Sequence, residues 1–530
     1  MKQSLTFLSL LGGLGLSGGT LLADDWSQWG GTHSRNMVST EKNIPGPLIK
    51  PGDFKKGTEE VDMATTHQLK WVAKVGSQTY GTPTIADGKV FVGTNNEEPR
   101  DPNHIGDRGN VMAFDEKTGE YLWQLVVPKL GAGKVSDWEF LGICSSATIV
   151  ENRGYVVTNR CEIVCFDVEG QKNGNQGMQD EGKYMVAPGE EPAKVGSKDA
   201  DIIWVYDMRG ELGVFPHNVA SSSVMVLGDK VIATTSNGVD WSHLNLPAPT
   251  APSLIMLDAK TGKLVAEEVS EISSRVLHCS WASPALAKVD GKDMLIFGAG
   301  DGWCYGLDPV PVEEEEDGEK FGVLKEHFRF DANPPEYREV KYPKPKGPNE
   351  IVATPVFYKG KVYVLTGQDP EHGEGVGMLS CIDPAKKGDI SGKAVWTFKG
   401  IERSMSTPAI VDDLLYTCDY RGFAYCFDAM TGEKYWEYDT FGHIWGSALV
   451  ADGKVFVGTE EGELIVLAAG KELKVIRGED GDLPAVEFNG PIYASPVVAN
   501  GVLYVATQSH LYAFSMDAAA APVKVSAKKE

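Results

Sequence analysis

The side chains in this sequence that could do chemistry are aromatic, charged and amide groups that do not recur at regular intervals. Trp281 and Trp445 each stand just before a short apolar run, where an indole ring offers a flat surface for a ring-shaped ligand. Charged and polar residues accompany them in the predicted connections between strands. The full candidate set for ligand binding is Trp281, Trp445, Asn218, Arg403, His443, Arg160, Asp240, Trp241, Asp369, Asp419 and Arg421. Mixed charges with aromatic rings indicate a site for a polar ligand.

No spacing typical of a catalytic or metal centre is found. The 10 His residues include no pair four positions apart and no CxxCH sequence for covalent haem. Asp101, Asn103 and Asp107 match half of a calcium loop, but Ile105 stands at the fifth position and the closing Glu is missing. The Asp301-Gly302 pair is interpreted as a turn. From the residues alone, the catalytic groups therefore stay unknown, and no metal ligand and no cofactor are predicted.

A repeated unit must position these side chains, and its clearest copy is Met405–Trp436. Three apolar runs separated by turn signals are followed by a fourth run that ends in Trp436, which is typical of four short antiparallel strands. Eight copies open with a Ser or Thr, the closest two 40 residues apart, at Thr82, Ser146, Ser222, Ser283, Thr354, Thr407, Ser447 and Ser495. The sequence predicts an all-β fold, an eight-bladed β-propeller of four-stranded antiparallel blades.

The ends of the chain suggest how the ring closes and where the protein resides. Residues 1–23 have the three zones of a secretory signal, with cleavage expected after Ala23 and a periplasmic or secreted destination. Residues 24–68 fit no blade and are predicted to form an arm on the propeller, which spans 69–517, and 518–530 form a disordered tail. The last copy lacks a fourth strand, so the strand around Trp71 should complete it.

Insertions distinguish the two faces of the predicted disc. Long connections between second and third strands, at 95–109, 237–253 and 367–377, converge on one face and also carry Asp107, Arg108, His243 and His372. The acidic run VEEEEDGEK is predicted to be a solvated loop. Two positions before each opening Ser or Thr stand Tyr80, Cys144, Ala220, Trp281, Val352, Met405, Trp445 and Tyr493. Their large rings either plug the axis or form a floor for a flat ligand, and we favour the plug.

Charge and cysteine usage limit the partners and the covalent chemistry. The formal net charge of -24 and pI of about 4.9 oppose nucleic-acid binding and attraction to anionic membranes, and no later apolar run is long enough for membrane insertion. Of the eight cysteines, most fall at repeat positions that other copies fill with small residues, which predicts buried fillers. Cys144, Cys161 and Cys279 lie outside these positions, and whether they form a disulfide stays open.

The repeat, with its Ser/Thr-Pro opening, Asp-Gly hairpin, strands such as KVFVGT and AYCFD, and closing TGEKYW, resembles the PQQ-like (pyrroloquinoline quinone) β-propeller repeat. The opening DDWSQWGGTHSRNMVS looks like that of uncharacterised exported bacterial members. The resemblance implies either a quinoprotein alcohol dehydrogenase, which holds the quinone and Ca²⁺ near the axis, or a scaffold without quinone. The dehydrogenases stack the quinone against a disulfide of adjacent cysteines, and no Cys-Cys pair occurs here.

Two functions remain after these considerations. The first is an exported binding or scaffold protein for an envelope protein or a small polar ligand on the face with the long insertions. The alternative is a PQQ- and calcium-dependent dehydrogenase that oxidises an alcohol or sugar. Enzyme activity and oligomeric state stay open at this point.

Overall fold

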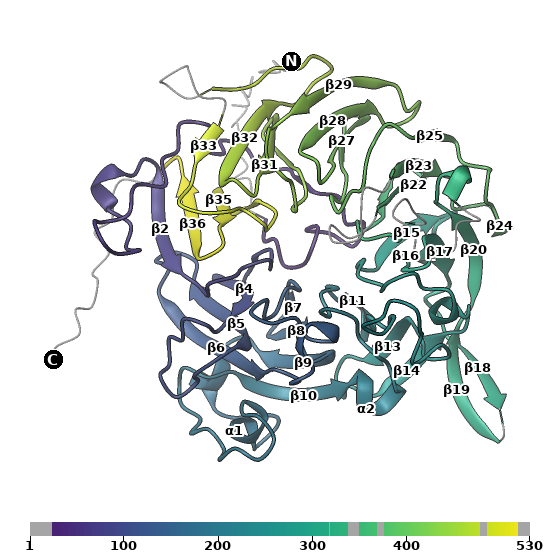
Figure 1. Ribbon diagram of the computed structural model, residues 1–530, viewed down its shortest axis with the longest axis horizontal. Coiled ribbons are helices and arrows are strands. Elements are labelled where there is room, and N and C mark those ends of the chain that lie inside the picture. Colours follow the sequence, from purple (N-terminus) through teal and green to yellow (C-terminus); the bar gives the residue numbers. More distant parts are fainter. Residues whose placement is uncertain (1–23, 317, 338–348, 368–375, 478–484, 518–530) are drawn as a thin grey trace, which may run out of the picture.

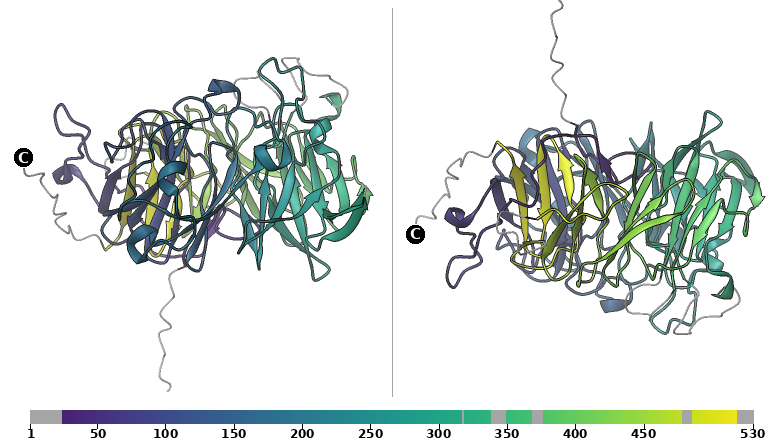
Figure 2. Two further views of the ribbon diagram at one scale, coloured as in Figure 1. Left: turned by 90° about the horizontal axis from the view of Figure 1, so that it is seen from below. Right: turned by 90° about the horizontal axis from the view of Figure 1, so that it is seen from above.

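A computed structural model describes residues 24–316, 318–337, 349–367, 376–477 and 485–517. Its strands form eight sheets that follow one another in chain order around a common axis (Figure 1). Edge-on, the molecule is a thick disc (Figure 2). The predicted eight-bladed all-β propeller is confirmed.

Blades 1 to 4 occupy the first part of the ring. Blade 1 contains β3 (Thr84–Ala86), β4 (Lys89–Asn95), β5 (Arg108–Asp115) and β6 (Tyr121–Pro128); blade 2 contains β7 (Thr148–Val150), β8 (Arg153–Val157), β9 (Glu162–Asp167) and β10 (Asp201–Asp207). Blade 3 contains β11 (Met225–Leu227), β12 (Lys230–Thr234), β13 (Leu254–Asp258) and β14 (Leu264–Glu268), extended by β19 (Glu319–Leu324) and β18 (Val312–Glu316). Blade 4 contains β15 (Ala285–Val289), β16 (Lys292–Gly298), β17 (Trp303–Leu307), β20 (Glu326–Asp331) and β24 (Gly388–Asp389).

Blades 5 to 8 complete the ring. Blade 5 contains β21 (Val356–Tyr358), β22 (Lys361–Thr366), β23 (Met378–Ile382) and β25 (Trp396–Phe398); blade 6 contains β26 (Ala409–Val411), β27 (Leu414–Cys418), β28 (Phe423–Asp428) and β29 (Lys434–Asp439). Blade 7 contains β30 (Leu449–Ala451), β31 (Lys454–Gly458), β32 (Glu463–Ala468) and β33 (Ala485–Glu487), with β1 (Val38–Ser39) at its inner edge. Blade 8 contains β34 (Val497–Ala499), β35 (Val502–Ala506), β36 (His510–Ser515) and β2 (Leu69–Lys74).

Short helices lie in the connections. The α-helices are α1 (Glu181–Tyr184) and α2 (Met208–Leu212), and the 3₁₀ helices are η1 (Met63–Thr65), η2 (Gly133–Val135), η3 (Gly170–Asn173), η4 (Ile272–Ser274) and η5 (Pro335–Tyr337). Within the described ranges, no helix combines the length and apolar character needed to cross a bilayer.

The acidic run is not a solvated loop, which corrects the sequence expectation. Strands β18 and β19 pair as an antiparallel hairpin, and β19 adds in parallel to the outer edge of blade 3 through Glu267↔Val323 and Glu268↔Leu324. Lysines on the same hairpin offset its charge, since Lys320 Nζ lies 2.6 Å from Glu313 Oε1 and Lys325 pairs with Glu314. Backbone pairing to an open sheet edge therefore outweighs the repulsion along the run.

Strand β2 closes the ring as predicted. It pairs antiparallel with β36, the last strand of the chain, so the N-terminal and C-terminal segments share blade 8. Its Trp71 belongs to a repeated contact between neighbouring blades, in which an outer-strand indole Nε1 donates to a backbone carbonyl of the next blade. The acceptors are Glu116 for Trp71, Val168 for Trp123, Ala259 for Trp204, Ala429 for Trp396 and Gly470 for Trp436.

The opening Ser and Thr residues link the inner strands into a ring. The Ser146 N–H donates to Ser223 Oγ at 2.9 Å, and the Ser223 N–H donates to Ser283 Oγ at 2.9 Å. The same bond continues through Thr354, Thr407, Ser447, Ser495 and Thr82. The ring member in blade 3 is therefore Ser223 and not Ser222, and the residue two positions earlier is Ser221 and not Ala220. Three consecutive serines at 221–223 made this register ambiguous in the sequence.

The segment after residue 24 threads the middle of the disc instead of lying on its outside. Backbone oxygens of Ser27, His33 and Ser34 accept from inner-strand residues of blades 2, 4 and 5, respectively. Arg35 is fully buried there and donates to the Pro284 and Val224 carbonyls at 2.8 and 3.1 Å. Burial lowers the pKa of Arg35 to about 9, so the guanidinium stays charged at neutral pH. This segment closes the axis on the face that carries the tight turns.

The cysteines do not form disulfides within the described residues. All eight are free thiols, seven of them buried and Cys144 partly buried. Cys161 and Cys279 Sγ donate to the neighbouring Thr235 and Ser236 carbonyls at 3.0 and 2.9 Å. The predicted signal at 1–23 and the tail at 518–530 lie outside the described residues, as do Asp369 and His372.

Candidate functional site

A cavity of about 660 Å³ opens on the loop face, which is the face opposite the tight turns. The Ser and Thr residues that link the inner strands surround this cavity. Trp29, from the N-terminal segment that crosses the middle of the disc, contributes to its lining. Trp29 is fixed by a 3.2 Å hydrogen bond from Nε1 to Thr354 Oγ1. The volume is within the range of small-molecule sites. The further lining residues that bear on binding are Gln78, Tyr80, Trp138, Glu139, Phe140, Asn218, Ser221, Trp281, Trp445 and Tyr493.

Aromatic rings form two opposed walls of this cavity. On one side Tyr80 and Tyr493 stack with ring centroids 4.5 Å apart, and the Trp445 ring meets both edge-on at 5.7 and 5.9 Å. Trp445 Nε1 donates to Glu460 Oε2 at 2.9 Å, which fixes the indole. On the other side Trp281 Nε1 donates to the Val219 carbonyl at 3.0 Å. The rings line the cavity and do not fill the axis, so the plug interpretation is wrong.

The described lining of the cavity contains almost no charge. Glu139, which is exposed, is the one ionisable carboxylate among these residues, and no Lys or Arg is present in that part of the lining. The Ser and Thr hydroxyls that link the blades are engaged in hydrogen bonds. The other uncharged polar groups at the walls include the side chains of Gln78, Asn218 and Ser221 and the hydroxyls of Tyr80 and Tyr493. The described surface favours uncharged or cationic ligands over anions.

Several charged residues predicted for the site lie outside this lining, around blades 6 and 7. The Arg403 guanidinium lies 4.6 Å from the Tyr420 ring centroid, and the His443 ring lies 4.7 Å from the same ring. Arg421 Nη1 lies 2.9 Å from Glu402 Oε1. Because Tyr420 packs edge-on against Trp445 at 5.3 Å, Arg403 and His443 are one ring removed from the cavity.

The predicted site residue Asp419 and the predicted turn residue Asp301 make contacts within their own blades. Asp419 is buried, and its carboxylate accepts from Tyr425 Oη at 2.7 Å and from the Phe423 N–H at 3.1 Å. Asp301 occupies the equivalent place in blade 4, where Tyr305 Oη donates to it at 2.5 Å, and burial raises its pKa to about 6. The interpretation of Asp301 as part of a turn agrees with these contacts.

Arg160 also makes a local contact. Its Nε lies 3.0 Å from Glu162 Oε1 on β9, and its carbonyl accepts from Arg209 at 2.8 Å. Asp369 lies outside the described residues. Of the predicted set, the structure therefore brings Trp281, Trp445 and Asn218 together in the cavity wall.

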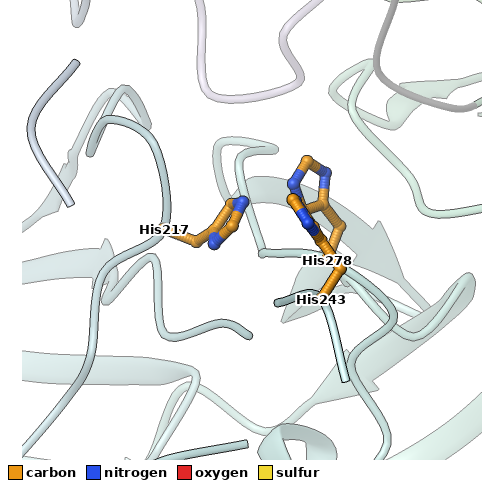
Figure 3. Close-up of side chains that lie close together, drawn as sticks. All are labelled: His217, His243 and His278. Carbon is orange, nitrogen blue, oxygen red and sulfur yellow. The ribbon is translucent and has the colours of Figure 1, made fainter. Parts of the chain in front are cut away.

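Three histidine side chains come together beside the cavity, and the sequence did not predict this cluster. Candidate ligand atoms of His217, His243 and His278 all lie within 4.8 Å of one another. Figure 3 shows the His217 ring on one side facing the rings of His243 and His278 on the other. His217 and His278 are almost fully buried, at 1% exposure each, and His243 is half-buried. The His278 ring also meets Trp281 edge-on at 4.7 Å, which connects this cluster to the cavity wall.

Backbone pairing explains why three distant segments bring these rings together. His217 lies in the crossing into blade 3, His243 in the β12–β13 insertion and His278 in the crossing into blade 4. The Gly238 N–H donates to the Phe215 carbonyl at 2.9 Å, and the Val239 N–H donates to the His278 carbonyl at 2.9 Å. Gly238 is required at this contact, because an added Cβ would lie 2.4 Å from the His278 oxygen.

The predicted residues Asp240 and Trp241 belong to the loop that carries His243. Asp240 Oδ1 accepts from the Ser242 hydroxyl at 2.5 Å, and Asn245 Nδ2 donates to Oδ2 at 2.8 Å. These hydrogen bonds lower the pKa of Asp240 to about 2, and the His243 N–H donates to the Asp240 carbonyl at 3.0 Å. Asp240 therefore shapes the turn, whereas the Trp241 side chain is 74% exposed and lies outside the cavity lining.

The three histidines have none of the short spacings that mark a metal site in a sequence. The separations come from loops of different lengths, so no local motif marks the three residues. A weaker signal was present: the two crossings and the insertion between them belong to adjacent blades and open on the same face. His243 was placed on that face from its loop, but His217 and His278 were missed.

A second group of candidate ligands contains Asp101, His104 and Asp199. His104 Nε2 lies 3.8 Å from Asp199 Oδ1, and both residues are buried. Asp107 of the half calcium loop is directed elsewhere, because its Oδ2 accepts from the Phe140 N–H at 2.8 Å. Asp101 and Asp107, which match half of a calcium loop in the sequence, therefore do not form one site in the described structure.

The protein is a PQQ-like β-propeller by class, because it has a ring of eight sheets whose outer-strand tryptophans donate hydrogen bonds to the next blade. More particularly, the chain belongs to the family described as outer membrane protein assembly factor BamB, whose model matches residues 61–172, 107–277, 341–438 and 375–513.

Individual relatives are distant. The chain is 23% identical over 486 residues to lupanine 17-hydroxylase [cytochrome c] of Pseudomonas sp., which covers 88% of this chain and 64% of that protein. The crystal structure of BamB from Moraxella catarrhalis matches with a TM-score of 0.50 at 14% identity, over 85% of this chain and 98% of that chain. Quinohemoprotein alcohol dehydrogenase from Comamonas testosteroni gives a TM-score of 0.45 at 13% identity, over 93% of this chain and 80% of that chain. The Moraxella structure supports the fold.

The described cavity does not fit the quinone that the resemblance implies. Pyrroloquinoline quinone is a carboxylated anion, and the described lining offers it no Lys or Arg. The thiol that lines the cavity is Cys144, a free cysteine whose pKa is raised by burial to about 12. The adjacent disulfide of the dehydrogenases therefore has no counterpart in these residues.

Proposed function

We propose that this chain is an exported binding protein whose loop-face cavity takes a small polar ligand with a flat apolar face, uncharged or cationic. The supporting observation is the aromatic cavity of about 660 Å³, whose described lining contains Glu139 but no Lys or Arg. A sugar ring or an aromatic amine has the required chemistry. Both present an apolar face to an indole and polar edges to hydroxyl and amide groups.

The two aromatic walls allow the free energy of ligand binding to be estimated. Each ring-on-ring contact contributes about 0.5–1.5 kcal/mol beyond area burial, and a cation over a ring contributes about 0.5–2 kcal/mol. Trp281 and Trp445 approach from opposite sides and are held by hydrogen bonds to Val219 and Glu460. Because these rings are already oriented, a ligand that enters between them meets walls that need little reordering.

The family description and one relative suggest other functions for this protein. The family description names an assembly factor, which fits a scaffold that binds an envelope protein with its loops. The similarity to lupanine 17-hydroxylase favours a quinoprotein enzyme, although the chain spans only 64% of that protein. A described lining without Lys or Arg argues against the quinone, so small-ligand binding is the function that the geometry supports best.

Titration calorimetry and tryptophan fluorescence with three probes test the proposal. The probes are 4-nitrophenyl glucoside as a neutral ligand, benzyltrimethylammonium as a cation, and pyrroloquinoline quinone with calcium as the anion. We expect saturable binding of the neutral or the cationic probe. Saturable binding of the quinone alone would refute the proposed selectivity, and binding of none of the probes would refute the small-ligand function.

A matched pair of tryptophan variants locates the binding. Trp281→Ala removes one wall of the cavity and should weaken binding about tenfold, which corresponds to about 1.4 kcal/mol. Trp241→Ala removes an indole that is 74% exposed and lies outside the cavity lining, so it should leave the affinity unchanged. Equal effects of the two substitutions would place the binding outside the cavity.

A further inference from the structure

We propose that His217, His243 and His278 form a binding site for one divalent transition-metal ion, of which Zn²⁺ is the representative. This proposal is independent of the ligand that occupies the central cavity. It rests on three imidazoles whose candidate ligand atoms lie within 4.8 Å of one another. Three histidines with an open fourth position are an established arrangement for Zn²⁺ in proteins.

The donor type selects the metal. Imidazole nitrogen suits Zn²⁺, Cu²⁺, Ni²⁺ and Fe²⁺, whereas Ca²⁺ and Mg²⁺ require oxygen ligands. Tetrahedral Zn–N bonds of about 2.0–2.1 Å place ligand nitrogens about 3.3 Å apart. The separations of at most 4.8 Å would therefore shorten by about 1.5 Å or less on binding. Side-chain rotation covers such a change without breaking the backbone pairing of the three segments.

Hydrogen bonds already orient part of the set. His217 Nδ1 lies 2.6 Å from the Val239 carbonyl, so this nitrogen donates its proton to the backbone. The proton on Nδ1 makes Nε2 the basic nitrogen of that ring, the form in which histidine binds metals. A backbone carbonyl that receives the second N–H of a ligating histidine is the usual support of such sites.

The surroundings supply negative charge close to the ion. Glu350 is 3% exposed, and its Oε1 lies 3.9 Å from His278 Nδ1. A buried carboxylate beside a ligating imidazole offsets the charge of a bound cation and raises the basicity of the ring. Trp281, which lines the cavity, meets the His278 ring edge-on at 4.7 Å. The half-buried His243 leaves an approach from the loop face.

The backbone segments that carry the three histidines lie close together at Gly238. An added Cβ on Gly238 would lie 2.8 Å from the His217 Cβ and 2.4 Å from the His278 carbonyl oxygen. Glycine therefore permits the loop to pass between two of the three histidine segments. The turn built on Asp240 then places His243 beside His278, where both rings face His217 (Figure 3). The three imidazoles meet because of these two local features.

Metal titration of the full chain tests the site. After treatment with EDTA and removal of the chelator, we expect one Zn²⁺ per chain by calorimetry and elemental analysis. Co²⁺ should give the visible absorption of a four- or five-coordinate complex, and excess Zn²⁺ should abolish it. Absence of saturable binding at 1:1 stoichiometry would overturn the proposal, as would binding of Ca²⁺ in preference to Zn²⁺.

Variants distinguish this site from scattered surface histidines. His243→Ala removes the least buried ligand and should weaken Zn²⁺ binding by more than the 10- to 100-fold typical of residues that only support a ligand. Glu350→Gln should weaken it within that 10- to 100-fold range. His443→Ala removes a half-exposed histidine on the same face and should change nothing. Unchanged affinity in His243→Ala, with loss in His443→Ala, would contradict the assignment.

A positioning variant adds a readout that ligand counting does not give. Gly238→Ala keeps all three histidines but forces the His217 and His278 segments apart. We expect weaker Zn²⁺ binding and an altered Co²⁺ spectrum, with circular dichroism unchanged from the unsubstituted chain. If Gly238→Ala disrupts the fold, the His243→Ala comparison decides. A folded Gly238→Ala chain with undiminished affinity would show that the three rings do not act together.

Discussion

Two glycines of blade 1 provide a sharp test of how the propeller closes. Gly119 ends the turn between β5 and β6 with φ of +70°, and Gly88 lies in the turn between β3 and β4 with φ of +69°. An added Cβ at Gly88 meets nothing within 4 Å, whereas at Gly119 it would lie 2.6–2.8 Å from three atoms of the Trp71 indole. Alanine at either position therefore has the same backbone strain, and only Gly119→Ala displaces Trp71.

The magnitudes follow from these contacts. Left-handed backbone costs an alanine about 1–2 kcal/mol, and this term is common to both variants. Displacement of the indole adds about 1–3 kcal/mol for overpacking. Loss of the 2.9 Å hydrogen bond from Trp71 Nε1 to the Glu116 carbonyl adds about 0.5–1.5 kcal/mol. Gly119→Ala should therefore be less stable than Gly88→Ala by about 1.5–4.5 kcal/mol.

Urea unfolding measured by circular dichroism gives the comparison directly. Hydrogen exchange provides a second readout, because Trp71 lies on β2, which pairs with β36 to close the ring. We expect faster exchange of amides in both strands for Gly119→Ala than for Gly88→Ala. Free energies of unfolding that differ by less than about 1 kcal/mol between the two variants would refute the role of this contact in closing the ring.

Two buried groups predict opposite dependences of stability on pH. Burial raises the pKa of Glu268 to about 7 from 4.5, so its contribution is fully present below pH 4.5 and is lost as pH rises through 7. That shift corresponds to about 3 kcal/mol, and Glu268→Gln should remove this part of the change in the free energy of unfolding between pH 4.5 and 8. Burial lowers the pKa of His510 to about 4 from 6.5, so its contribution is present above pH 6.5 and is lost as pH falls through 4. His510→Phe, which keeps a ring against Phe54 at the 5.1 Å contact, should lose less stability between pH 7 and 4 than the unsubstituted chain. Urea unfolding across the pH range checks both expectations, and parallel curves for variant and unsubstituted chains would contradict them.

The sequence predicted the parts of the fold that recur in every blade. The tryptophan column ending in Trp436 was recognisable because each copy donates to a carbonyl of the next blade. Turns such as Asp87-Gly88 were recognisable because their backbone has positive φ at both residues, as the structure shows. The same logic failed at Ser221–Ser223, where three like residues offered three registers. The hydrogen bonds of Ser223 with Ser146 and Ser283 identify it as the residue that links the blades.

The candidate site was less predictable because its residues are the ones that do not repeat. Trp281 and Asn218 were selected as departures from the repeat, and the structure places both in the cavity wall. The sequence did not predict that Trp29, from a segment outside the blades, also lines the cavity. The acidic hairpin was misjudged for a related reason, since its partner strand β14 belongs to another blade.

The histidine cluster shows why repeat analysis identifies candidate residues better than it identifies sites. A repeat fixes where each crossing and each loop begins, so it places His217 and His278 at neighbouring entrances to the ring. The repeat does not predict how a 17-residue connection such as 237–253 folds back. The conformation of that connection brings the three histidines together. Here Gly238 and Val239 pair with both crossings before the loop turns at Asp240. The chemistry of this face therefore depends on a loop that no other described blade shares, and variants at Gly238 and Asp240 probe it more directly than variants in the blades.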